Sequence, residues 1–155
     1  MTVQFRAWQP GDAVQLAQVA NNIQVWNNLR NRFPHPYTLR DAENWIALCA
    51  EKEKPEHFCI EADGLVCGGI GFIPGTDVES RSAELGYFLG EAWWGKGIAT
   101  QAVAQILPYL AGNHSFVRIF SVVFAYNTAS MKVLQKNGFV LEQIRKKAVF
   151  KNGVL

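Results

Sequence analysis

The chain has 155 residues, of which 49% are apolar, and this is the size of one domain with a substantial buried core. Fifteen Lys and Arg residues against 13 Asp and Glu give a net charge of +2, too small to indicate binding to nucleic acid or an anionic membrane. No apolar run approaches the roughly 18 residues of a membrane span, and residues 1–12 lack the apolar region of a signal peptide. We therefore expect a cytoplasmic protein with one domain over residues 1–155, either a monomer or a homodimer, without nucleic-acid or membrane partners.

The cysteines and histidines exclude two other classes. Cys49, Cys59 and Cys67 are odd in number and lack CxxC spacing, so we expect reduced, mostly buried thiols and no disulfide framework. The three histidines are scattered without metal-ligand spacing, and we expect no metal.

Six segments have the pattern of strands, either alternating apolar and polar residues or forming short apolar runs between turn residues. They are residues 3–8, 57–62, 65–73, 83–89, 116–124 and 139–147. The fifth segment is apolar enough to be buried on both faces. Asp63-Gly64 is a strong hairpin signal between two of the strands, and Asn152-Gly153 predicts a further hairpin turn.

Four segments place apolar residues at helical spacing: 16–29, 42–49, 97–107 and 127–137. Thr38 or Asp41 can cap the second helix, and Asn127 can cap the fourth, which stops at Asn137-Gly138. Pro108 is expected to end or kink the third. The resulting order, β-α-α-β-β-β-α-β-α-β, predicts one mixed α/β domain with an antiparallel first half and a later βαβ unit.

The most informative segment is GEAWWGKGIAT, residues 90–100, where a strand ends, a glycine-rich turn follows and a helix begins. The first turn of a helix has free backbone N–H groups and a positive end of the helix dipole. Gly95 and Gly97 let an anion approach the backbone, and Lys96 adds charge at the rim. The segment therefore suits a pyrophosphate.

Other interpretations of this loop remain open from the residues alone. A Walker-A loop requires Ser or Thr where Gly97 stands, and a dinucleotide fingerprint requires a third glycine where Thr100 stands. A plain glycine turn before a helix is the remaining alternative.

The segment from Trp94 to Ala99, WGKGIA, resembles the pyrophosphate loop of the GNAT superfamily of acyl-CoA-dependent N-acyltransferases, whose signature is [QR]-x-x-G-x-[GA]. Trp94 departs from the usual Gln or Arg, and this form is similar to the RimJ/RimL-like branch. Three more segments resemble that branch in the right order: FPHPYTLRDAENWI (33–46), AELGYFL (83–89) and NTASMKVLQKNGF (127–139). The resemblance covers essentially the whole chain.

The resemblance implies a GNAT-like fold with splayed central strands and an N-acetyltransferase that moves an acetyl group from acetyl-CoA to a primary amine. It implies that the acceptor is a small-molecule amine or a protein N-terminus. It also implies a set of residues that hold the cofactor: Phe88 and Leu89 on the fourth strand, Gly95, Lys96, Gly97, Ile98, Ala99 and Thr100 in the loop, and Asn127 and Ser130 at the last helix.

The chemistry of amide formation requires a base, because a free amine is mostly protonated at neutral pH. Glu84 is the candidate base: it lies on a mostly apolar strand, four residues before Phe88, on the same face unless a bulge intervenes. A surface carboxylate, or one paired with a cation, is the alternative interpretation of Glu84.

The departing thiolate needs a donor, and Ser130 is the candidate, while Asn127 fits a helix cap in any case. The resemblance places Leu134 where other members of the superfamily have a Tyr acid. Tyr87 and Tyr126 are fallback acids.

Two further groups of side chains are candidates. Lys132 and Lys136 either reach the adenosine phosphates or line a solvated helix face. The aromatic residues in the first third of the chain either shape the amine pocket or pack in the core: Trp26, Phe33, Tyr37 and Trp45.

The resemblance also implies one more strand after Asn152-Gly153, whereas the sequence ends at Leu155. We expect that this strand is truncated or that another chain supplies it. Together with Leu134, its absence leaves one alternative function open: a catalytically weak acetyl-CoA-binding sensor or interaction module.

Overall fold

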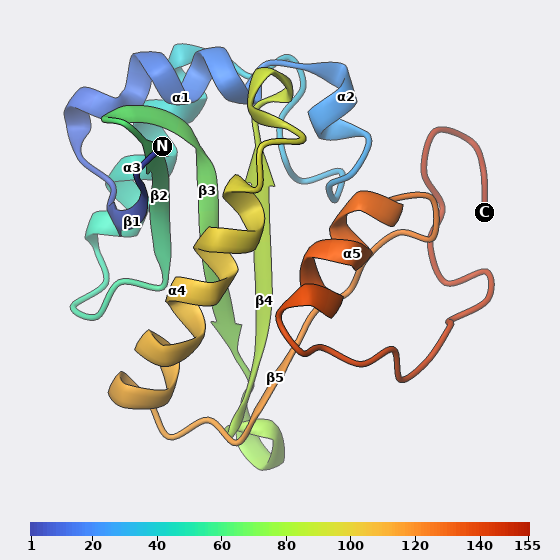
Figure 1. Cartoon of the computed structure of the whole chain (residues 1–155). Coiled ribbons are helices and arrows are strands. Elements are labelled where there is room, and N and C mark those ends of the chain that lie inside the picture. Colours follow the sequence, from blue (N-terminus) through green and yellow to red (C-terminus); the bar gives the residue numbers. More distant parts are fainter.

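A five-stranded sheet in the order β1-β2-β3-β4-β5 runs through the computed structural model, which describes residues 1–155 (Figure 1). The strands are β1 (Val3–Ala7), β2 (His57–Ala62), β3 (Leu65–Pro74), β4 (Ser82–Leu89) and β5 (Arg118–Phe120). The first four pair antiparallel, whereas β4 and β5 are parallel and joined through a helix. The predicted mixed α/β class, with its antiparallel half and βαβ unit, is confirmed.

Five α-helices cover the sheet: α1 (Ala13–Ala20), α2 (Ile23–Trp26), α3 (Leu39–Ala50), α4 (Ile98–Asn113) and α5 (Thr128–Lys136). Single 3₁₀ turns lie at η1 (Pro10–Asp12), η2 (Asp77–Glu79) and η3 (Glu91–Trp93). None of the helices is long and apolar enough to span a membrane.

Two apolar clusters lie on opposite faces of the sheet. The larger packs α4 against the strands through residues such as Ile106 and Leu110, together with Phe72 and Leu85. The smaller packs α1 and α3 on the other face, around Leu16. Each cluster buries one side of the sheet, so β2, β3 and the inner part of β4 are held between two helical layers.

Local sequence signals determine several boundaries as expected. Asp63 and Gly64 adopt positive φ angles of 50° and 82°, which is the turn that a two-residue hairpin requires. Thr38 and Asp41 form a reciprocal capping box, in which each side chain accepts the other's backbone N–H. Asn127 caps α5, and Gly138 follows that helix with a φ of 85°.

The first two helices differ from the prediction of one helix over 16–29. The chain breaks at Asn21 and Asn22, and the Asn22 side chain accepts the Gln24 backbone N–H at 2.8 Å. An Asn that satisfies a free N–H begins a new helix, and it therefore competes with continuation of the old one.

Pro108 does not end α4, which continues to Asn113. Ile106 and Leu110 flank it and are fully buried against the sheet. Burying two such side chains contributes roughly 3–6 kcal/mol, enough to offset the approximately 3 kcal/mol that an internal proline costs.

Two predicted strands are wrong in extent. Of residues 116–124 only Arg118–Phe120 pair, with Ser82–Glu84, and Val117 is 74% exposed instead of buried. Residues 139–147 form no strand, because no neighbouring segment supplies a ladder for their backbone groups. The Asn152-Gly153 turn forms with φ angles of 53° and 76°, closed by a bridge between Lys151 and Val154.

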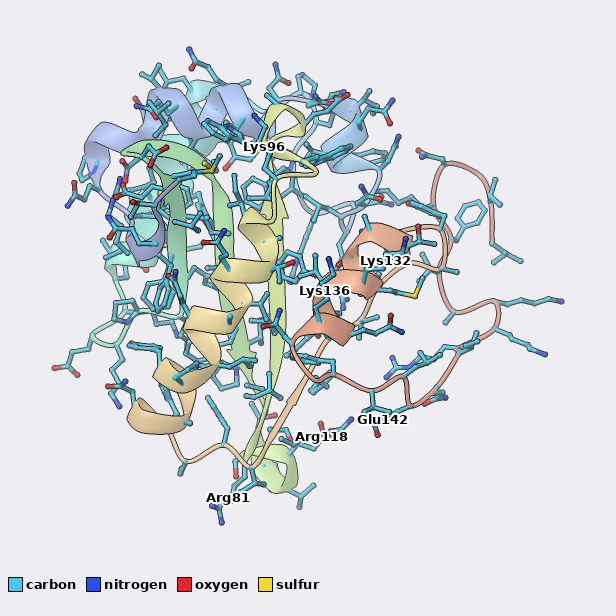
Figure 2. The ribbon with its side chains drawn as sticks, in the orientation of Figure 1. Arg81, Lys96, Arg118, Lys132, Lys136 and Glu142 are labelled. Atoms are coloured by element: carbon cyan, nitrogen blue, oxygen red, sulfur yellow. The ribbon has the colours of Figure 1, made fainter.

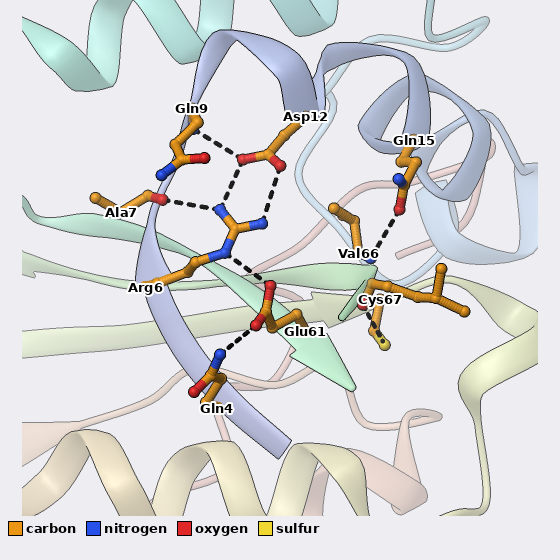
Figure 3. A network of polar contacts seen from close by, with 10 residues as sticks. Gln4, Arg6, Ala7, Gln9, Asp12, Gln15, Glu61, Val66 and Cys67 are labelled. Atoms are coloured by element: carbon orange, nitrogen blue, oxygen red, sulfur yellow. Dashed lines mark hydrogen bonds and ion pairs between the residues drawn. The ribbon is translucent and has the colours of Figure 1, made fainter. Parts of the chain in front are cut away.

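A buried polar network fastens β1 to the segment that enters α1 (Figure 3). The Arg6 guanidinium binds both oxygens of Asp12 at 2.8 and 2.9 Å, and its Nε donates to Glu61 at 2.7 Å. Gln4 also donates to Glu61, and the Gln9 N–H donates to Asp12. Asp12 and Glu61 are the two buried carboxylates of the domain.

The network controls how these carboxylates titrate. Burial alone would raise the pKa of Asp12, but the hydrogen bonds from Arg6 and the Gln9 N–H hold that pKa below its ordinary value. The hydrogen bonds from Gln4 and then Arg6 lower the pKa of Glu61. A carboxylate with a lowered folded-state pKa contributes stability above its unfolded pKa of about 4, and that stability is lost as the pH falls further.

We expect Arg6→Met to lower the free energy of unfolding by about 3–5 kcal/mol, because it leaves two buried carboxylates without their cation. In that variant burial raises the pKa of Asp12, whereas Gln4 still donates to Glu61, so the difference in stability from the parent should narrow as the pH falls from ~7 to ~5. Urea unfolding across this pH range measures both effects. Lys52→Met is the matched control, since it removes an exposed pair with Glu56 and should cost less than about 1 kcal/mol. Equal losses for the two variants would contradict the role of the network.

Candidate active site

The parting of β4 from β5 creates the site. The two strands pair only from Ser82 to Glu84, after which the chain following β5 leaves the sheet towards α5 (Figure 1). Residues 85–89 of β4 continue to pair with β3 on one side and have no strand on the other. The predicted splayed strands are therefore present, with an open backbone edge along the last half of β4.

Hydrogen bonds at both ends of β4 identify the backbone groups on this open edge. The carbonyls of Leu85 and Leu89 point to it, since Leu85 accepts from Ser121 Oγ and Leu89 from Trp94 Nε1, both at 2.9 Å. Because backbone direction alternates along a strand, the amides of Tyr87 and Leu89 also face the opening. The Phe88 amide faces β3 instead, so of the two predicted residues Leu89 offers its N–H to the opening.

The glycine-rich loop lies at the upper end of this opening and leads into α4. Gly95 and Gly97 adopt φ angles of 72° and 76°, which side chains with a Cβ rarely tolerate. The first intrahelical N–H donor of α4 is that of Gln101, which bonds to the Gly97 carbonyl. The backbone amides of three residues are left free for an anion, as expected from the sequence: Ile98, Ala99 and Thr100.

Trp94 stands where the family signature has Gln or Arg, and its side chain contacts the end of β4. Its indole N–H bond to the Leu89 carbonyl joins the loop to the end of β4. Lys96 is exposed at the rim, with its ammonium 5.3 Å from the centre of the Trp93 ring.

The N-terminus of α5 faces the opposite side of the opening. Asn127 Oδ1 accepts the Ser130 N–H at 3.2 Å, as a helix cap does. The Ser130 hydroxyl lies 2.6 Å from the Tyr87 hydroxyl, which is also 3.2 Å from the Ser130 carbonyl oxygen. Leu134, at the position of the Tyr acid of other superfamily members, is buried in the larger apolar cluster.

Glu84 lies on the face of β4 opposite to that of Tyr87. The β3–β4 register is continuous from Gly68 to Pro74, so no bulge alters the phase between Glu84 and Phe88. Glu84 Oε2 is 3.4 Å from Arg30 Nη2, and the Glu84 side chain is 25% exposed. The carboxylate is therefore accessible, and its one ion pair is with an arginine that is itself 61% exposed.

Three of the four candidate pocket aromatics gather near Phe88. Phe33 packs edge-on against Phe88 with ring centres 5.3 Å apart and lies 5.0 Å from the ring of Tyr37. The indole of Trp26 donates to the Phe33 carbonyl. Trp45 does not join them, because its ring packs against His57.

Basic side chains border the opening on two sides (Figure 2). Lys96 lies at the loop, whereas Lys132 and Lys136 lie on α5 and form no ion pair within the chain. Arg118 on β5 differs from these lysines, because its guanidinium pairs with the Glu142 carboxylate at 2.8 Å. These three lysines thus form no ion pair within the chain and lie beside the opening.

The profile of the acetyltransferase (GNAT) domain matches residues 2–140. The chain belongs to this family. As a GNAT family member it is an acetyl-CoA-dependent N-acetyltransferase of the RimJ/RimL-like kind, as the sequence indicated.

Individual relatives agree with the family. The SPbeta prophage-derived uncharacterized N-acetyltransferase YokL of Bacillus subtilis is 25% identical over 96% of this chain and 82% of its own. The ribosomal-protein-serine acetyltransferase of Escherichia coli is 34% identical over 54% of this chain and 48% of its own. The chain spans about half the length of this and several other curated relatives.

Solved structures match over nearly the whole chain. Mycobacterium smegmatis RimJ in complex with CoA-disulfide has a TM-score of 0.86 and 25% identity, with 98% of this chain and 77% of that chain covered. The GNAT-like fold expected from the sequence is therefore confirmed.

The Tyr87–Ser130 contact is the feature that sequence reasoning missed. Tyr87 and Ser130 were assigned separately, one as a fallback acid and the other as a donor, and nothing in their spacing of 43 residues predicts a contact. The available signal was the strand parity of Tyr87, which places it on the face opposite Glu84.

We expect Gly97→Val to weaken CoA and acetyl-CoA binding by roughly tenfold or more, because a branched side chain blocks anion approach to the N-terminus of α4. Isothermal titration measures this. Gly64→Val is the matched control: Gly64 also has a positive φ, 82°, but it lies in the β2–β3 turn. The control should show a comparable loss of stability with normal CoA binding. Normal binding by folded Gly97→Val would refute the assignment of the loop.

Proposed function

We propose that this chain transfers the acetyl group of acetyl-CoA to a primary amine by direct attack, with Glu84 as the base and Ser130 as the donor to the leaving sulfur. The observation that carries the proposal is the open edge of β4, with a free helix N-terminus at one end and a hydroxyl beside it. An extended ligand with an anionic end and amide groups along its length is complementary to such an edge. Acetyl-CoA has this chemistry.

The cofactor would lie along the opening. Its pyrophosphate would accept from the free amides at the start of α4, near Lys96, where the helix dipole favours negative charge. Its arm would pair with the backbone of β4, and the thioester oxygen would accept from the Leu89 N–H. Asn127 would act at the far side, by capping the helix that presents Ser130. These groups are fixed by the fold before the ligand binds, and such preorganisation is what stabilises a developing oxyanion.

The amine would approach from the face of β4 that holds Glu84 and Phe88. Glu84, through ordered water, would take up the proton that the amine nitrogen releases as that nitrogen attacks the thioester carbon. Collapse of the tetrahedral intermediate breaks the carbon–sulfur bond, and the sulfur leaves as a thiolate that accepts a hydrogen bond from Ser130. The proton on Glu84 then passes to solvent.

The acceptor is either a protein N-terminus or a small amine. The first is supported by the similarity to a ribosomal-protein-serine acetyltransferase, and the second by the small aromatic group around Phe33 and Phe88, which borders the Glu84 face. A panel of N-terminal peptides, diamines and amino acids, with thiol release and amide product both measured, tests the proposal. Amide formation supports it. CoA binding without turnover on the whole panel would refute it in favour of a binding module.

We expect Glu84→Gln to lower kcat by roughly 10²- to 10⁴-fold, the range for loss of a general base. Acetyl-CoA affinity should be unchanged, because the carboxylate faces the amine. High pH should partly restore the rate of the variant by supplying neutral amine.

Arg30→Gln is the control for the ion pair, since it removes the Arg30–Glu84 contact and keeps the carboxylate. It should retain kcat within a few-fold. If Glu84→Gln instead raises KM and leaves kcat unchanged, Glu84 attracts a cationic acceptor and is not the base.

Activity should survive dialysis against EDTA, because the proposed steps use protein donors and a carboxylate only. The structure contains no group of three or more His, Cys, Asp or Glu side chains that could hold an ion. The measurement is the rate before chelation, after chelation and after Mg²⁺ or Zn²⁺ is added back. A loss that either ion restores would overturn the metal-free scheme.

A further inference from the structure

The opening between β4 and α5 is crossed by few side-chain hydrogen bonds. Ser121 reaches the Leu85 carbonyl near the point where the strands part, and Tyr87 reaches Ser130 further along. Tyr87 thus bridges the strand that would bind the acetyl group and the helix that would offer the leaving-group donor. Its ring is partly buried against the larger apolar cluster, and this packing restrains the position of its hydroxyl.

We propose that Tyr87 is a positioning residue for Ser130: its hydroxyl donates to Ser130 Oγ and thereby leaves the seryl proton free to point at the sulfur of the cofactor. This role rests on the proposed function of Ser130. Tyr87 itself does not touch the reacting atoms in this scheme.

The direction of the hydrogen bond follows from the chemistry of the two hydroxyls. A phenol is far more acidic than an aliphatic alcohol and is the better donor, and the 2.6 Å separation is that of a strong O–H···O bond. The competing acceptor, the Ser130 carbonyl oxygen, is farther away at 3.2 Å. If Ser130 donated to Tyr87 instead, its single proton would be unavailable to the thiolate.

Two other features favour a donor at this place. Burial raises the pKa of Tyr87, although its contact with Ser130 acts in the opposite direction, so the phenol keeps its proton through the neutral range. Ser130 also lies in the first turn of the nine-residue helix α5, where the positive end of the helix dipole stabilises a nearby thiolate. Hydrogen bonding to Tyr87 polarises the seryl O–H further in the same direction.

A purely structural role makes a different prediction. The Tyr87 hydroxyl can also tie β4 to α5 through the Ser130 carbonyl, and that contact survives when the Ser130 side chain is removed. An anchoring tyrosine would therefore matter equally with and without the Ser130 hydroxyl. A positioning tyrosine would matter only with it.

A double-mutant cycle separates the two roles. We expect Ser130→Ala to lower kcat by roughly 10- to 100-fold, as loss of a hydrogen bond to a charged group does, and Tyr87→Phe by roughly 2- to 10-fold. In the Ser130→Ala background, Tyr87→Phe should change kcat less than twofold. Equal effects of Tyr87→Phe in both backgrounds would overturn the positioning role, as would wild-type kcat in Tyr87→Phe.

A second measurement needs no acceptor and so stays informative if no amine is turned over. The thiolate absorbance of bound CoA reports the pH at which its thiol ionises. We expect this pH to be lower in the parent than in Ser130→Ala by roughly one to two units, with Tyr87→Phe in between and no further change in the double variant. If CoA binds and the four proteins titrate alike, the inference fails. If these titrations differ as expected but no amine is acetylated, only the proposed function fails.

Discussion

Everything in the candidate site depends on β4 and β5 pairing for three residues and then separating. An unpaired strand edge in a protein interior is costly, because each exposed N–H or C=O must find a partner. Here the carbonyls of Leu85 and Leu89 are taken by Ser121 and Trp94, so side chains satisfy part of the edge. The amides of Tyr87 and Leu89 are left for a ligand. The fold therefore maintains a strand edge whose backbone groups are only partly satisfied within the chain.

Much of the architecture could be predicted because its signals are local. Asp63-Gly64, the Thr38–Asp41 box and the Asn127 cap each act within four residues, and the structure confirms all three. The same holds for Gly97, whose positive φ is required wherever a loop turns sharply into a helix. Local chemistry also explains the one helix break that was missed, since Asn22 forms its cap with a residue only two positions away.

What could not be predicted depends on partners far away in the sequence. The strand expected over 116–124 shortens because the chain parts from β4 after Phe120, and Pro108 is tolerated because Ile106 and Leu110 pack against the sheet. Neither outcome is visible in the segment itself. The same limit applies to the site: sequence patterns offer Glu84 and Ser130 as candidates, but the contact between Ser130 and Tyr87 requires the β4–α5 geometry.

The alternation of β4 separates the two halves of the proposed chemistry. Glu84 and Phe88 lie on the face covered by α1 and α3, whereas Tyr87 lies on the face shared with α4 and α5. The base and the leaving-group donor that we propose would therefore act from opposite faces of one strand. A single inserted residue between positions 84 and 87 would place both groups on one face. The regular β3–β4 register prevents this, and Gly68 contributes, because a Cβ there would collide with the Phe88 carbonyl that approaches it. The close passage of two backbones at Gly68 is thus part of what fixes which side chains of β4 share a face.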